Sequence, residues 1–422
     1  MTRLIGAVVL IAVIIATIAA AWWYRPWSPY SPAAISALDD PDQFVDTFQR
    51  MDEILPSRTI EASDPDPLPR SLRDLDFTYE WAGAEKTLED WFAEARATSF
   101  MVVSGGEVIY ETYRQGADAD TRHTSWSVGK SFVATLIGMA LDEGLIESLD
   151  DPAEKYAPGY AGTDYGATSI RDLLTMSAGM DFQEEYSETE PSDIRPLFFN
   201  TFILNREPDA MVAEIVRERE PGADLHYTSP NTQVLSAVAR GIYDASLAEI
   251  VEDRIWAPLE MTRDATWLQN KPDAAGQALG YCCLQAATED YAKFGELYRN
   301  LGRHDGEQLV SADWAEAVGQ AQAQWAEPAE DGPYPGRGYG LHFWLADGYQ
   351  PSFAAAGVYG QWIWIDRPRG VVIVQTAGDP VWTERRLETF HLFDTLAQHV
   401  SPEPQAASEP APDAEPDTEP TE

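Results

Sequence analysis

Short apolar runs near both ends of the chain's long central body show the pattern of β-hairpins. Phe100–Val103 and Val108–Tyr113 are rich in β-branched and aromatic residues and flank a turn that contains Gly105-Gly106. Gln361–Ile365 and Val371–Thr376 repeat this pattern close to the end of the body. Runs of this kind on either side of a glycine-containing turn predict two antiparallel hairpins.

Between and after the hairpins, apolar residues recur with helical spacing. The predicted helices are Ser127–Leu145, Ile170–Met176, Asp209–Arg219, Thr232–Tyr243, Ser246–Trp256, Asp290–Leu301 and Thr383–Val400. Strands from both ends of the body would form one antiparallel sheet, flanked by helices, with the middle of the chain as an inserted helical subdomain. The pattern therefore predicts an α+β fold.

The N-terminal segment is long and apolar enough to cross a bilayer. Leu4–Tyr24 holds 21 residues without a charge and follows Arg3. Arg3 predicts a cytoplasmic N-terminus, with Trp22-Trp23-Tyr24 at the far interface. The alternative is a signal peptide cleaved at Ala19-Ala20-Ala21. Either way we expect the body outside the cytoplasm: periplasmic and anchored to a bacterial-type inner membrane through residues 4–24, or secreted after cleavage.

Composition divides the remainder of the chain into three parts. Residues 25–75 form a Pro- and Asp-rich extension with one helix-like stretch at Phe44–Leu55, and residues 76–400 form the body. Residues 401–422 carry seven acids, six prolines and no base. Such a segment cannot bury enough apolar surface to fold, so its composition predicts a disordered acidic tail. Together with the anchor at residues 1–24, the chain then has four parts.

The charge and the cysteine and histidine content exclude several classes of function. The 422 residues include 29 Lys+Arg against 70 Asp+Glu, a net charge of −41, which excludes nucleic acid as an obvious partner. The six histidines form no H-E-x-x-H motif, and we expect no metal and no cofactor. For the adjacent Cys282 and Cys283, two small buried residues are favoured over a vicinal disulfide.

A serine and a lysine one helical turn apart form the strongest candidate for a nucleophile. Ser127-Val128-Gly129-Lys130 is an S-x-x-K motif at the start of a helix suited to burial, and Lys130 is one of only five lysines. A buried ammonium needs a partner or loses its charge. Residues i and i+3 share a helix face, so the amine can take the serine proton, while the Ser127 N–H can hold an oxyanion. The alternative is a plain helix cap, with Lys130 reaching solvent.

The second candidate segment runs from Pro221 to Asn231. A Pro-Gly turn leads to Tyr227, Ser229 and Asn231, just before a predicted helix. A tyrosine near an ammonium can hold a lowered pKa and carry a proton to a leaving group. The alternative is that Ser229 or Asn231 caps the helix and Tyr227 only packs.

The third candidate segment is Ala355–Gln361, which enters a predicted strand. Its alanines and glycines let a ligand approach the backbone closely. The N–H of Gln361 would then be the second oxyanion donor, beside that of Ser127. The alternative is the simple entry of an edge strand.

Together the three segments resemble the serine β-lactamase-like hydrolases, the penicillin-recognising superfamily. That family has S-x-x-K at the start of a buried helix, then Y-x-[NS] in a helical subdomain, and then a K-T-G-type strand. Here the order is Ser127/Lys130, Tyr227/Ser229 and Val358-Tyr359-Gly360. Three further stretches resemble its branch of class C-like esterases and 6-aminohexanoate-oligomer hydrolases: Ile170–Gly179, Pro258–Met261 and Ala286–Gly295.

The resemblance implies a β-lactamase/transpeptidase-like fold and a serine hydrolase without a cofactor. Ser127 would attack a carbonyl, Lys130 and Tyr227 would share removal of its proton, and Tyr227 would protonate the leaving group. Ser229 would orient Lys130. The remaining substrate-binding residues implied by the resemblance are Asn231, Val358, Tyr359, Gly360 and Asp181.

One departure from the family bears on the substrate. Val358 stands where the resemblance places the K-T-G lysine, which with the threonine holds a substrate carboxylate. Because a valine cannot do this, we expect a carboxylic ester or linear amide as the small-molecule substrate. Two alternatives remain: a non-catalytic ligand-binding sensor on the same fold, and an enzyme that hydrolyses β-lactams or peptides.

Overall fold

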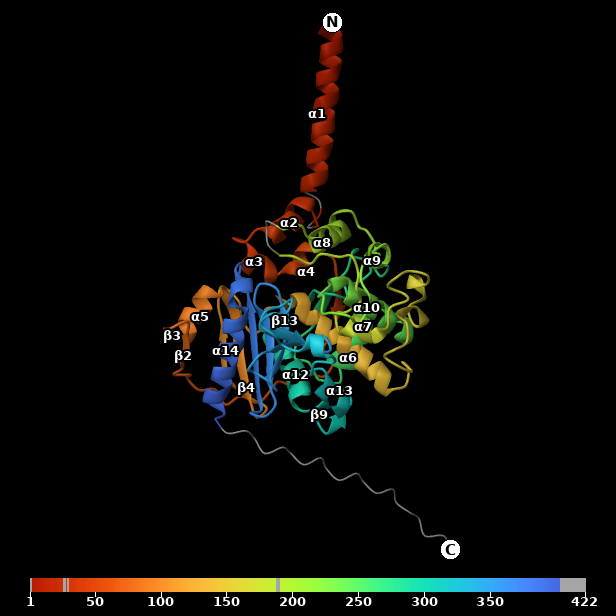
Figure 1. Ribbon diagram of the computed structural model, residues 1–422. Helices are drawn as coiled ribbons and strands as arrows, with labels where there is room; N and C mark the ends of the chain where they lie inside the picture. The colour runs from red at the N-terminus through yellow and green to blue at the C-terminus, as the bar shows by residue number, and fades with distance from the viewer. Residues whose placement is uncertain (1, 26–27, 29, 187–189, 403–422) are drawn as a thin grey trace.

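The computed structural model describes residues 2–25, 28, 30–186 and 190–402 (Figure 1). Its main sheet has seven antiparallel strands in the order β11-β12-β13-β14-β15-β4-β5. Their bounds are β4 (Ala97–Ser104), β5 (Glu107–Tyr113), β11 (Arg337–Tyr339), β12 (Trp344–Ala346), β13 (Phe353–Gly357), β14 (Gln361–Asp366) and β15 (Val371–Ala377). β15 pairs with β4, with Val374 opposite Met101. The two predicted hairpins therefore meet within one sheet, as expected.

Helices cover both faces of this sheet and fill the neighbouring lobe (Figure 1). The α-helices of the body are α5 (Leu88–Glu94), α6 (Gly129–Asp142), α7 (Ile170–Leu174), α8 (Ile194–Ile203), α9 (Pro208–Ala213), α10 (Ser229–Tyr243), α11 (Leu247–Val251), α12 (Thr288–Arg299), α13 (Ala312–Ala317) and α14 (Trp382–Val400). Short turns of helix are η2 (Trp126–Val128), η3 (Ala153–Lys155), η4 (Pro158–Tyr160), η5 (Glu252–Trp256) and η6 (Gln324–Ala326). The predicted α+β arrangement is confirmed.

Two of these helices form the layers on either side of the sheet. Phe390 of α14 packs edge-on against Trp364 of β14. On the opposite face α12 lies close to β14 and β15, where a Cβ added to Gly295 would stand 2.5 Å from a Val372 methyl. Glycine at this position therefore lets α12 lie directly against the sheet.

Some helix bounds differ from those that the sequence predicts. α10 begins at Ser229 rather than Thr232, because Pro230 occupies the first turn, where its missing N–H costs nothing. α9 ends at Ala213, well before the predicted end at Arg219. The pattern does not predict α8, which has a proline in its first turn and packs Phe198 against Trp126, with ring centroids 5.6 Å apart.

A second, four-stranded sheet holds the start of α6 in place. Its order is β1-β7-β8-β6, all antiparallel, with bounds β1 (Ser57–Ile60), β6 (His123–Thr124), β7 (Ala265–Leu268) and β8 (Leu284–Ala286). β6 leads directly into Ser125, whose N–H donates to the carbonyl of Leu284 at 2.7 Å. Two small hairpins, β2 (Thr78–Trp81) with β3 (Ala84–Thr87) and β9 (Arg303–His304) with β10 (Glu307–Gln308), lie outside both sheets.

The N-terminal helix α1 (Thr2–Tyr24) projects away from the body (Figure 1). The extension after it forms α2 (Pro32–Ser36), η1 (Ala37–Asp39), α3 (Phe44–Phe48) and α4 (Met51–Ile54), which pack on the body. Phe44 and Phe48 contact Tyr359, with ring centroids 4.4 and 5.3 Å away. The predicted disordered tail lies almost wholly outside the described residues, which end at 402.

Candidate active site

The serine and lysine of the S-x-x-K motif are in direct contact. Ser127 lies in η2, and Lys130 follows in the first turn of α6. Lys130 Nζ donates a hydrogen bond to Ser127 Oγ at 2.8 Å and another to the carbonyl oxygen of Tyr281 at 2.7 Å. The lysine side chain is buried, so it does not reach solvent as the alternative interpretation required.

Burial changes the proton affinity of this amine. The loss of water lowers the pKa of Lys130 to about 8, against an opposing effect of the negative charge on Glu184. A larger share of this amine than of an ordinary lysine is therefore neutral near pH 7, and a neutral amine can accept a proton.

Tyr227 completes this group of three. Its ring centroid lies 5.2 Å from Lys130 Nζ, and the side chain of Ser127 lies close enough to the phenol to act on its pKa. Burial, with the charge of Glu184, holds the pKa of Tyr227 well above its ordinary value. The phenol is therefore neutral at rest and can pass a proton while it contacts the serine.

Glu184 is a residue of the site that no sequence motif indicates. Its carboxylate accepts hydrogen bonds from the backbone N–H of Ser229 at 2.5 Å, from Ser229 Oγ at 2.8 Å and from Tyr186 Oη at 2.6 Å. Ser229 therefore has a different partner from the expected one: its hydroxyl contacts Glu184, while Lys130 contacts Ser127 and Tyr281. Because Glu184 and Ser229 are far apart in the sequence and meet only in the folded chain, no short sequence motif contains both.

The wall opposite the serine is formed by Gly357 and Val358. A Cβ added to Gly357 would stand 3.1 Å from the backbone nitrogen of Ser127 and 2.5 Å from the carbonyl oxygen of Ser125. Both Gly357 and Val358 line a cavity that also contains Ser127. The backbone of residues 357–358 therefore lies beside the N–H of Ser127. The expectation had placed Gln361, at the start of the next strand, in this position.

The position of Gln361 corrects the expectation that its N–H faces the oxyanion. Tyr359 and Gly360 have φ angles of 64° and 94°, so residues 358–360 form a tight turn between β13 and β14. Gln361 lies after this turn and pairs with Gly357 as the first residue of β14. Its side chain bonds both backbone groups of Ala377.

The other predicted binding residues lie in different environments. Val358 and Tyr359 line the cavities beside Ser127. Asn231 is buried and accepts hydrogen bonds from Tyr165 Oη and from Thr228 Oγ1, so it belongs to the packing of α10. The carbonyl of Gly360 accepts from the Gln375 amide, and Asp181 is exposed outside both cavities. The sequence motifs alone do not distinguish the residues that line a cavity from those that only stabilise the fold.

Two cavities of different character meet at Ser127. The narrower one, about 60 Å³, is mostly apolar, with walls from Phe198 and Phe199 of α8, Tyr281, and Leu38 of the N-terminal extension. The wider one, about 570 Å³, contains Tyr227 together with charged and aromatic side chains from β11, β12 and α14. A substrate that reaches Ser127 thus has separate spaces for the two sides of its scissile bond.

The family model described as Beta-lactamase matches residues 88–395. The chain belongs to the beta-lactamase family. A 6-aminohexanoate-dimer hydrolase from Paenarthrobacter ureafaciens is 28% identical over 341 residues, which cover 79% of this chain and 85% of that protein. The family and these relatives make the protein a serine hydrolase.

Solved structures show the same fold. A protein from Bacillus anthracis assigned to the 6-aminohexanoate-dimer hydrolases superposes with a TM-score of 0.77 at 24% identity, covering 87% of this chain and 97% of its own. A class C beta-lactamase superposes with a TM-score of 0.52 at 14% identity, covering 74% and 93%. The β-lactamase/transpeptidase-like fold that the sequence motifs implied is confirmed.

In this beta-lactamase-family chain the two cysteines are bonded to each other. Cys282 and Cys283 form a disulfide between adjacent residues. They are buried, as expected, but the interpretation as two separate small residues is wrong. The N–H of Cys283 donates to Ser125 Oγ at 3.2 Å, and Tyr281 just before the pair accepts from Lys130. The disulfide thus lies in the segment that contacts both Ser125, two residues before the serine, and Lys130.

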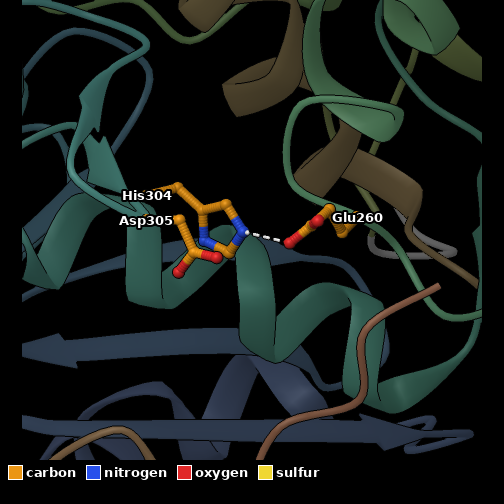
Figure 2. A group of neighbouring side chains, drawn as sticks. All are labelled: Glu260, His304 and Asp305. Atoms are coloured by element: carbon orange, nitrogen blue, oxygen red, sulfur yellow. Dashed lines mark hydrogen bonds and ion pairs between the residues drawn. The ribbon is translucent and has the colours of Figure 1, made fainter. Parts of the chain in front are cut away.

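A separate group of side chains lies at Glu260, His304 and Asp305 (Figure 2). His304 Nε2 and Glu260 Oε2 are 3.2 Å apart and form a hydrogen-bonded pair at the surface. This group shares no residue with the cavities beside Ser127. We assign the group no catalytic role.

Proposed function

We propose that this serine hydrolase cleaves a carboxylic ester or a linear amide through an acyl-enzyme on Ser127, activated by Lys130 and Tyr227. The contact of Lys130 Nζ with Ser127 Oγ at 2.8 Å, between two buried side chains, is the observation that carries the proposal. A lysine whose pKa is lowered to about 8 suits a general base better than an ordinary ammonium does.

In the first half of the reaction, Ser127 Oγ bonds to the substrate carbonyl carbon while its one proton passes to Lys130, which returns it to Tyr227 once the phenol has given up its own proton. The backbone N–H groups of Ser127 and Val358 hold the oxyanion, since Gly357 places this stretch of backbone against the serine. Tyr227 then protonates the leaving alcohol or amine, and the bond to it breaks. A water molecule, deprotonated by the same groups, releases the acid and restores Ser127.

Two observations support an ester or linear amide over a β-lactam. A curated relative is a 6-aminohexanoate-dimer hydrolase, whose name specifies a linear amide. The segment Val358-Tyr359-Gly360, matched in sequence to K-T-G, forms a turn and carries no lysine.

The competing function is that of a sensor that binds a ligand without turnover. A purely binding site has no use for a serine in contact with a lysine of lowered pKa and a neutral tyrosine, so hydrolysis is favoured. Labelling with a fluorophosphonate followed by mass spectrometry, combined with turnover of p-nitrophenyl esters and linear amides, separates the two.

We expect label on Ser127 and turnover that falls by at least about 10³-fold in Ser127→Ala. Ser131→Ala is the matched control, because Ser131 lies next to Lys130 in α6 and donates to the carbonyl of His342 instead. Labelling of Ser127 without turnover of any ester or amide would support the sensor. Rapid β-lactam turnover would contradict the substrate assignment.

We also propose that α1 anchors the protein in a membrane, with the body outside the cytoplasm. Residues 3–24 are long and apolar enough to span a bilayer and are not buried against the body. A signal sequence has the same properties, so the intact mass of the protein isolated from membranes tests the proposal. Retention of residues 1–24 is expected, and a mature N-terminus after Ala21 would contradict it.

A further inference from the structure

Among the residues that the structure describes, two arginines in the wider cavity have no hydrogen-bonded or ion-paired partner. Arg337 of β11 is only 9% exposed, and the Nε atom of Arg386 on α14 is buried without a hydrogen-bond partner. Within the described part of the chain, neither guanidinium donates a hydrogen bond or lies within 4 Å of a carboxylate. An unpaired buried charge is costly.

Other buried or half-buried arginines of this chain show how unusual this is. Arg217 and Arg367 donate to backbone carbonyl oxygens, and Arg385, the residue before Arg386, pairs with Asp379 at 2.6 Å. With 70 Asp+Glu against 29 Lys+Arg, acidic partners are abundant in this sequence. The absence of a described acidic partner at both positions therefore leaves room for an external anion.

Aromatic rings hold the two guanidinium groups at the cavity wall. Arg337 Cζ lies 4.8 Å from the Trp344 ring centroid and 5.4 Å from that of Tyr334. Arg386 Cζ lies 4.1 Å above the Trp382 ring. Stacking fixes the plane of a guanidinium while leaving its N–H groups free to donate.

The same cavity contains the proposed proton donor for the leaving group. Tyr227 and Ser127 line it together with both arginines, and the charge of Arg386 acts on the pKa of Tyr227. The backbone N–H of Tyr227 donates to Tyr334 Oη at 2.9 Å, and Tyr334 lies beside Arg337. The leaving-group side of the substrate therefore faces the arginines.

We propose that Arg337 and Arg386 form a binding site for a carboxylate on the leaving-group side of the substrate, which makes the preferred substrate an ester or amide of a hydroxy or amino acid. The inference rests on the proposed function for its orientation. The cavity is also lined by Glu184, Glu185 and Glu384, so three carboxylates accompany the two guanidinium groups, and a singly charged carboxylate enters at a lower electrostatic cost than a dianionic phosphate.

The test compares two butyrate esters of p-nitrophenol that carry either a carboxylate or an uncharged carboxamide at the same ring position. For the full-length protein in detergent, we expect kcat/KM for the carboxylate ester to exceed that for the carboxamide ester by about tenfold or more. Arg337→Gln and Arg386→Gln should each remove most of this preference, which is measured as the ratio of the two kcat/KM values within one variant so that a change in turnover common to both esters cancels. Arg303→Gln removes an exposed arginine outside the cavity and should keep the preference.

A binding measurement separates failure of this site from failure of the proposed chemistry. Calorimetry with the carboxylated p-nitrophenol and Ser127→Ala protein needs no turnover. Binding that is stronger than that of the carboxamide phenol, and that is lost in the Arg337→Gln/Arg386→Gln variant, would support the site even if no ester is cleaved. Equal binding of the two phenols, or a carboxylate preference that survives the double substitution, would overturn it.

Discussion

The Nζ atom of Lys130 lies 2.7 Å from the carbonyl oxygen of Tyr281, the residue that immediately precedes the disulfide between Cys282 and Cys283. The lysine is therefore held by one hydrogen bond to the serine of its own helix and by a second to a segment about 150 residues later in the chain. This second bond keeps the amine beside Ser127 and Tyr227 and away from solvent.

The first prediction concerns the pH dependence of the reaction. Because only a neutral amine accepts a proton, kcat/KM should rise as the pH increases through about 8, the pKa to which burial lowers Lys130. A profile of kcat/KM from acidic to alkaline pH on a neutral ester measures this. Activity that is already maximal in mildly acid solution would contradict the role of Lys130 as a base.

The second prediction concerns the charge of Glu184. This carboxylate raises the pKa of Lys130, so Glu184→Gln should lower that pKa and shift the rise of kcat/KM toward lower pH. The glutamine oxygen can still accept a hydrogen bond from Ser229, so this variant removes the negative charge while it keeps the hydrogen bond. Asp181→Asn, an exposed carboxylate outside the cavities, is the control and should leave the profile in place. A shift in the opposite direction would exclude the electrostatic explanation.

The third prediction concerns the close approach of Gly357 to the serine. In Gly357→Ala the new methyl would stand 2.5 Å from the Ser125 carbonyl, which must displace the oxyanion wall. We expect kcat to fall by about 10²-fold or more, as on loss of an oxyanion donor. Gly159→Ala is the matched control, since nothing lies within 4 Å of its Cβ position. Equal activity of the two variants would refute the placement of the wall.

The fourth prediction concerns the N-terminal extension. Phe44 is 3% exposed and packs on Tyr359, which lines both cavities. Phe44→Ala should lower the free energy of unfolding by about 3 kcal/mol and raise KM, because the wall of the narrow cavity loosens. Denaturant unfolding and steady-state kinetics measure the two effects. Leu72→Ala, at a largely exposed position, should change neither quantity. An unchanged KM in Phe44→Ala would show that the extension stabilises the fold without shaping the cavity.

The sequence by itself determined the elements whose interactions are local. The hairpins β4–β5 and β14–β15 follow from apolar runs around turns, and the contact of Ser127 with Lys130 follows from their spacing on one helical turn. The order of the three motifs also indicated the family, which the family model confirms. Each of these features needs only neighbouring residues or the order of segments.

Only the tertiary structure decided which distant groups surround the serine. Glu184, Arg337 and Arg386 come from segments without a distinctive pattern, and packing brings them to the cavities. The tight turn at residues 358–360, where two positive φ angles reverse the chain before β14 begins, places Gln361 after the turn, and for this reason we propose the N–H of Val358 as the second oxyanion donor. Local spacing specifies contacts within a helix or hairpin, whereas the position of a charge in a cleft depends on every layer packed around it.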